Sequence, residues 1–104
     1  MYQKLLTKEI LNKIPKLYAQ DGKGDDAIVY VKFFHPASRW TWYATEFDGV
    51  DTFFGFVVGS DPQCDELGYF SLSELKSVNV RGLGIERDMH FGTKTLRQAK
   101  EERA

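Results

Sequence analysis

The stretch that most constrains the fold runs from Arg39 to Gly59 and reads RWTWYATEFDGVDTFFGFVVG. Aromatic and β-branched residues crowd the segments 40–47 and 52–58, and the Asp48-Gly49 pair between them is a strong hairpin signal. Strand side chains alternate between two faces, and here both faces are apolar. Either helices cover both faces of the resulting sheet, or one face presents aromatic rings to a partner.

Alternation also predicts which side chains share a face of this hairpin. One face should hold Trp40, Trp42, Ala44, Phe53, Gly55 and Val57, and the other Tyr43, Thr45, Phe47, Phe54, Phe56 and Val58. A four-residue loop over 48–51 is favoured over a two-residue loop. The shorter loop would set Glu46 opposite Asp51, a like-charge pair that costs several tenths to about 1 kcal/mol.

Helical signals flank the hairpin on both sides. Thr7 is a good N-cap for a helix that starts at Lys8, and Pro15 should end that helix or restart it. The sequence Ser71-Leu-Ser-Glu74 is a capping box that predicts a short helix over 72–78. Residues 95–104 can form a charged helix with Thr95 and Gln98 as a second capping box, but Leu96 is its only large apolar residue, so the tail over 92–104 should fray.

Three further strands are expected, over 28–34, 67–70 and 85–91. A chain of 104 residues is too short for two independent cores. The sequence therefore predicts one α+β domain over 1–104, with an antiparallel sheet of four to five strands centred on the aromatic hairpin. A helix should precede the hairpin, and a short helix should follow the fourth strand.

Charge and cysteine content restrict the partners and the compartment. The formal net charge is −1, from 14 basic and 15 acidic residues, so no long-range field attracts nucleic acid. Six acids and no base lie between Glu46 and Glu66, which predicts a locally acidic surface. The single Cys64 has no partner in the chain, and there is no targeting segment or apolar span. We expect a cytoplasmic protein without membrane contact, as a monomer or a weak dimer.

Candidate chemistry is sparse. Glu46, Asp48 and Asp51 could together bind a hard cation, but their spacing lacks the twelve-residue loop of an EF-hand, and turn formation with surface charge is the better interpretation. His35 and His90 are too few for a zinc site, and neither has a metal-ligand spacing. We expect no metal, no cofactor and no catalytic residue.

The tryptophans are the more promising residues. Trp40 and Trp42 could stack on the bases of single-stranded nucleic acid, but proteins of that kind add a basic groove, and this region is acidic. Core packing or a protein interface is the favoured interpretation.

Six segments together resemble a known family along nearly the full length of the chain. They read LLTKEI (5–10), PKLYAQD (15–21), VKFFHP (31–36), WTWYATEFDGVDTFFG (40–55), ELGYFSLSEL (66–75) and IERDMHF (85–91). The chain resembles the uncharacterised bacterial family catalogued as domain of unknown function 2958. That resemblance implies a protein of plasmids, integrative elements or phages, and it provides no catalytic residues. Polar motif positions that packing does not demand correspond to Glu46, Asp48, Arg87 and Asp88. His35 stands where family members often have another residue.

These observations predict a small, non-enzymatic accessory protein that binds another protein through an aromatic and acidic surface. The expected binding residues are Trp40, Trp42, Glu46, Asp48, Asp51, Arg87 and Asp88. The resemblance suggests action for a mobile element against host defence. Two alternatives stay open: a hydrolase or nuclease that uses a divalent metal on the hairpin acids, and a single-stranded nucleic-acid binder.

Overall fold

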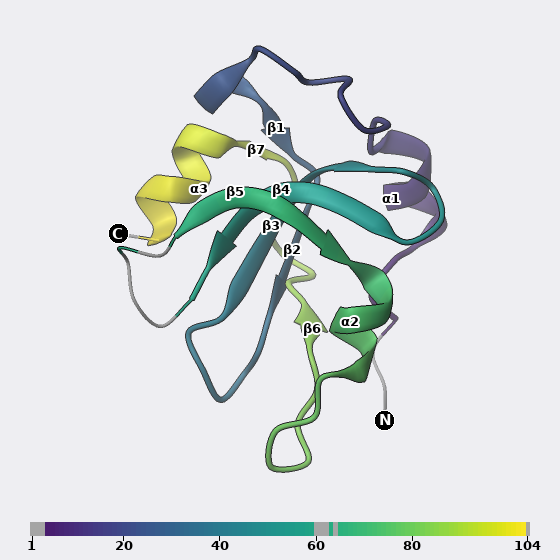
Figure 1. Cartoon of the computed structure of the whole chain (residues 1–104), viewed down its shortest axis with the longest axis vertical. Helices are drawn as coiled ribbons and strands as arrows, with labels where there is room; N and C mark the ends of the chain where they lie inside the picture. Colours follow the sequence, from purple (N-terminus) through teal and green to yellow (C-terminus); the bar gives the residue numbers. More distant parts are fainter. Residues whose placement is uncertain (1–3, 60–62, 64, 104) are drawn as a thin grey trace.

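The fold is the expected α+β arrangement (Figure 1). The structure is a computed structural model, and it describes residues 4–59, 63 and 65–103. The helical elements are α1 (Lys8–Lys13), the 3-10 turn η1 (Gly24–Asp26), α2 (Leu72–Ser77) and α3 (Leu96–Arg103). The strands are β1 (Ile28–Val29), β2 (Val31–Phe34), β3 (Thr41–Phe47), β4 (Thr52–Val58), β5 (Glu66–Ser71), β6 (Glu86–Arg87) and β7 (Lys94–Thr95).

The main sheet has five strands in the order β5-β4-β3-β2-β6, and every neighbouring pair is antiparallel. The predicted hairpin, β3 and β4, lies at its centre, which confirms the expected architecture. The single strand predicted over 28–34 is wrong, because the chain leaves one sheet and enters another at Tyr30. β1 pairs with β7 in a separate two-stranded sheet, whereas β2 joins the main sheet. The strand predicted over 85–91 is reduced to the two residues of β6.

Within the hairpin, the four-residue loop is confirmed, but the predicted faces are wrong near its tip. The register shifts between Ala44 and Glu46, so the ladder skips Thr45. An extra residue of this kind, a β-bulge, reverses the alternation beyond it. Phe47 therefore lies opposite Phe53 and stacks on it with ring centroids 4.3 Å apart. Glu46 moves to the opposite face from the one that strict alternation predicts.

Gly55 shows how tightly the two strands approach beside this bulge. A Cβ atom at Gly55 would lie 1.9 Å from the Tyr43 carbonyl oxygen, which is part of the backbone and cannot move aside easily. Gly55 pairs with Ala44 and lies diagonal to Trp42, because Trp42 pairs with Val57. Only glycine fits this position without displacing β3.

Both faces of the sheet are partly covered. The first face packs under the N-terminal segment, α1 and α2, in a cluster whose fully buried centre includes Phe33 and Phe53. The second face packs under β1, the segment around Phe91 and α3. No helix in the described part of the chain is long and apolar enough to span a membrane.

The C-terminal helix α3 is held more firmly than the sequence predicted. Leu96 is the expected anchor, but Ala99 is also fully buried, and both join the cluster on the second face. The predicted capping box forms, since the Gln98 amide donates to Thr95 Oγ1 and the Thr95 amide donates to Gln98 Oε1. Ala99 is small enough to pack directly against the second face of the sheet. A count of large apolar residues therefore underestimates how much of α3 is buried.

Candidate functional site

Glu46 is a structural residue rather than part of a surface. Its side chain is 4% exposed. The amides of Tyr18 and Gln20 donate hydrogen bonds to its two oxygens, at 2.8 and 2.7 Å. Tyr18 adopts a left-handed backbone with φ 72°, which is unfavourable for a residue with a Cβ. The carboxylate therefore fastens the strained 18–20 segment to the second face of the sheet.

Asp48 closes the hairpin loop. Its Oδ1 accepts hydrogen bonds from the amides of Val50 and Asp51, both at 2.8 Å, and of Thr52 at 3.0 Å. These bonds, with the one from Val50 contributing most, hold the pKa of Asp48 below its ordinary value. Gly49 takes the positive φ that the turn requires, at 89°. The motif DG is thus fully explained by turn geometry.

Asp51 connects the hairpin loop to helix α2. Its carboxylate accepts from the Ser73 amide at 2.8 Å and from the Ser73 hydroxyl at 2.9 Å, while its carbonyl accepts from the Leu72 amide at 2.7 Å. Ser71 caps the same helix by accepting from the Glu74 amide, as predicted. Asp51 was not foreseen as a second cap because it is distant in sequence.

The predicted hairpin acids therefore do not meet at one site. Glu46 lies on the second face, Asp48 lies inside the loop, and Asp51 points to α2. Among the described residues, no group of three or more histidine, cysteine or acidic side chains could hold a metal ion. His35, which is 3% exposed, has both ring nitrogens engaged with backbone groups of Ala37 and Leu83.

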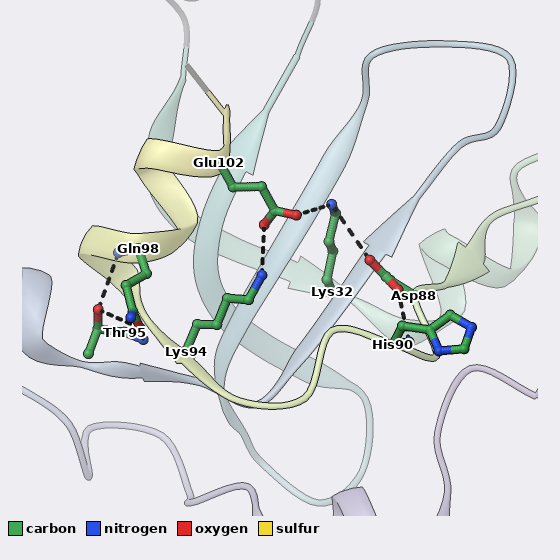
Figure 2. A network of polar contacts seen from close by, with 7 residues as sticks. All are labelled: Lys32, Asp88, His90, Lys94, Thr95, Gln98 and Glu102. Carbon is green, nitrogen blue, oxygen red and sulfur yellow. Dashed lines mark hydrogen bonds and ion pairs between the residues drawn. The ribbon is translucent and has the colours of Figure 1, made fainter.

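Arg87 and Asp88 lie together at the β6 edge of the sheet. The Arg87 guanidinium donates to the Lys4 carbonyl and so attaches the N-terminal segment. Asp88 accepts from the His90 amide at 3.0 Å and lies 3.8 Å from the Lys32 ammonium. Figure 2 shows Lys32 between Asp88 and Glu102, with the Glu102 contact at 3.1 Å. This ion-pair chain links α3, β2 and the segment after β6.

Three hollows lie around these elements. One of about 330 Å³ lies between α1 and the 87–93 segment, and a shallow one of about 580 Å³ lies beside β2 and His90. Arg87 and Asp88 line both of them. A third hollow, of about 600 Å³, is mostly apolar and lies between the N-terminal segment, the hairpin tip and α2. The Arg87 and Asp88 side chains have structural partners, so neither hollow that they line contains a free charged group from this pair.

The two tryptophans do form a surface. Trp40 and Trp42 stack on the first face of the sheet, with ring centroids 6.0 Å apart and planes inclined by 24°. Trp40 is 44% exposed and lies over Gly59, and Trp42 is half-buried at the margin of the core. Val57 pairs with Trp42 and is also half-buried. We call these three residues, Trp40, Trp42 and Val57, the tryptophan corner.

Acids from the predicted acidic stretch border the tryptophan corner, although they are not the acids predicted as binding residues. Glu66 pairs with Val57 and so lies in the same row of the first face as Trp42, two strand spacings or about 10 Å away. Asp65 accepts a hydrogen bond from the Gly59 amide at 3.2 Å, directly beneath Trp40. Trp40 and Trp42 are therefore the predicted binding residues that the structure places on one surface with apolar and acidic neighbours.

Strand β5 carries a second exposed group that sequence reasoning missed. Leu67 is 47% exposed and Tyr69 is 57% exposed, on the second face of the sheet. Tyr69 contacts Phe54 edge to face, and a hydrogen bond with the Tyr18 side chain raises the pKa of Tyr69. The alternation of the segment ELGYF predicts a strand, but it does not indicate that this strand lies at the edge of the sheet.

Comparison with known proteins identifies a family and no function. The chain matches the family described as "Protein of unknown function (DUF2958)" over residues 5–99. No curated protein and no solved structure matches it. The match covers every strand and the first half of α3.

Proposed function

We propose that this chain, which belongs to the DUF2958 family, is a non-enzymatic protein-binding domain that docks a partner on the tryptophan corner. The observation that carries the proposal is the Trp40–Trp42 stack, in which the large Trp40 ring is 44% exposed. Tryptophan is among the residues enriched at the centres of protein interfaces. An exposed ring that is already stacked on its neighbour loses little conformational entropy on binding, which favours such a role.

The chemistry of the border indicates the partner. Glu66 is exposed, and Asp65 lies beside the corner, so a partner should offer an apolar side chain to Trp40 and Lys or Arg to these acids. We extend the proposal to the setting that the family resemblance suggests: a bacterial cytoplasmic protein of a mobile element whose partner is a host defence protein.

A photo-crosslinking experiment tests this proposal. A photoreactive phenylalanine derivative, which keeps an aromatic ring at the position, replaces Trp40 in one variant and Asn12, on the exposed side of α1, in the control. We expect a discrete crosslinked protein at position 40 that excess wild-type chain competes away and that Glu66→Lys weakens at least tenfold. Identical crosslinking patterns at positions 40 and 12 would refute the proposal.

One alternative draws on the same observation. Stacked tryptophans also bind bases, and each base stacked on an aromatic side chain contributes about 1–3 kcal/mol. The neighbouring acids oppose a phosphate backbone, so we place this function second. Titration with a single-stranded oligonucleotide separates the two, because quenching of tryptophan fluorescence that weakens steeply with salt would favour nucleic acid.

A further inference from the structure

The sheet has one long edge, and that edge is β5. In the strand order β5-β4-β3-β2-β6, the six residues of β5 pair with β4, and no other described strand pairs with its outer side. The opposite edge is the two-residue β6. Alternate residues of an edge strand direct N–H and C=O groups away from the sheet, where another strand can pair with them. Proteins usually block such an edge with lysine, proline or a bulge, and Glu66–Ser71 contains none of these.

Side chains make this edge complementary to itself. Leu67 and Tyr69 project from the second face, whereas Phe70 is buried on the first. The acids Asp65 and Glu66 lie at the start of the strand only. A second strand running antiparallel would therefore bring its own acids to the far end, and like charges would not face each other.

We propose that β5 pairs antiparallel with β5 of a second copy of this chain, about a twofold axis at Gly68. In this register Leu67 lies opposite Tyr69 of the second copy, and Glu66 lies opposite Phe70 of the second copy. An aliphatic side chain opposite an aromatic one is a favourable cross-strand pair. The two five-stranded sheets become one continuous sheet of ten strands.

The geometry allows few other registers. A twofold axis between two antiparallel strands of one sheet is perpendicular to the sheet, so the first faces of both copies lie on the same side. Directly opposite residues must then share a face, and this requires the axis to pass through a residue and not between two. An axis at Tyr69 would set Leu67 directly opposite Ser71 of the second copy. An axis at Leu67 would set Tyr69 directly opposite Asp65, which precedes β5. Of these three axes, only the one at Gly68 places both Leu67 and Tyr69 directly opposite an apolar or aromatic side chain of the second copy.

The interface between the two copies is small, so the dimer should be weak. Six strand residues span about 20 Å. The interface is thus smaller than the roughly 1,600 Å² of a standard stable complex. We expect a dimer that forms at high micromolar concentration, and a covalent trap is the suitable assay for it.

Single cysteines test both the pairing and its register, in a background where Cys64 is replaced by serine. Across the axis, the Cα atoms of position 68 would lie about 4.5–5.5 Å apart. This range permits a disulfide. Positions 67 and 69 would lie about 7–8 Å from their own copies. A Cβ at Gly68 meets no atom within 4 Å, so Gly68→Cys should not disturb the fold.

We expect Gly68→Cys to form a disulfide-linked dimer at least tenfold faster than the exposed control Asn12→Cys on α1. Adding Tyr69→Lys should slow that reaction at least tenfold, and adding Trp40→Ala should leave it unchanged, because the pairing does not depend on the tryptophan corner. Equal rates at positions 68 and 12, faster crosslinking of Leu67→Cys or Tyr69→Cys, or insensitivity to Tyr69→Lys would each overturn the proposal. Capture of a different protein at Gly68→Cys would also overturn it.

Discussion

Replacing Glu46 by glutamine tests whether this acid is structural. The side chains of glutamate and glutamine have nearly the same shape, so Glu46→Gln changes hydrogen bonding without creating a cavity. The carboxylate accepts from the Tyr18 and Gln20 amides. Glutamine can accept from one of them through its oxygen, but its NH₂ group must then face the other amide, which is also a donor.

The expected loss follows from these two contacts. A hydrogen bond to a charged group contributes about 1.5–3 kcal/mol, and a buried donor left without an acceptor costs about 1–3 kcal/mol. Removing a buried charge recovers part of its desolvation cost. We therefore expect a net destabilisation of about 2–3 kcal/mol, because one bond is lost and one donor is orphaned. For a domain of this size, that corresponds to a fall in Tm of roughly 10–20 °C.

Denaturant unfolding monitored by tryptophan fluorescence measures this effect, with Glu86→Gln as the matched control. Glu86 is an exposed glutamate on β6, so its replacement should change the free energy of unfolding by less than about 0.5 kcal/mol. If Glu46→Gln also changes the free energy of unfolding by less than about 0.5 kcal/mol, the two amide contacts are not stabilising the fold, and the structural assignment of Glu46 is wrong.

Three further variants test contacts that hold the hairpin and α3 in place. Gly55→Ala should prevent folding or cost more than about 3 kcal/mol, whereas Gly68→Ala should cost about 1 kcal/mol or less, as measured by denaturant unfolding. Leu96→Ala should cost about 2–4 kcal/mol by detaching α3, against less than about 1 kcal/mol for Arg97→Ala in the same assay. The pKa of Asp48 is lowered in the folded state, so its stabilisation is present above the ordinary value of 3.8 and is lost as pH falls through the folded pKa. Asp48→Ala should flatten the pH dependence of unfolding in that acidic range.

Local rules predicted the hairpin, the caps and the sheet. The segments on each side of Asp48-Gly49 needed only strand propensity and a turn signal, and Thr7 and Ser71 cap helices as their sequences indicate. The caps and the turn depend on contacts between residues within four positions of one another. The interactions that they require are therefore visible in a short stretch of sequence.

The bulge at Thr45 could not be predicted because one of the two contacts that hold it comes from outside the hairpin. The Gln20 side chain donates to the Thr45 carbonyl, and the Thr45 hydroxyl donates to the Phe54 carbonyl. The first contact joins residues that are 25 positions apart. Alternation assumes a regular ladder, so it assigned Phe47 and Glu46 to the wrong faces once the ladder skipped Thr45.

The residues of the candidate site also divide into those whose role local sequence rules predicted and those whose role depends on distant contacts. Trp40 and Trp42 were found from strand alternation alone, and the structure keeps them together. Glu46 and Asp51 looked like a polar surface because their backbone donors come from the 18–20 segment and from α2, whose positions only the folded chain defines.

The role of the hairpin acids limits how the function can be tested. Glu46, Asp48 and Asp51 each accept backbone N–H groups, and each bonds to a different part of the fold. Replacing any of them removes acceptors from backbone donors, so loss of any activity would follow from damage to the fold and would not identify a reacting group. Trp40 and Leu67 are different, because their side chains are apolar and exposed. Variants at these two positions can change binding while the free energy of unfolding stays nearly constant, and they are where a functional search should begin.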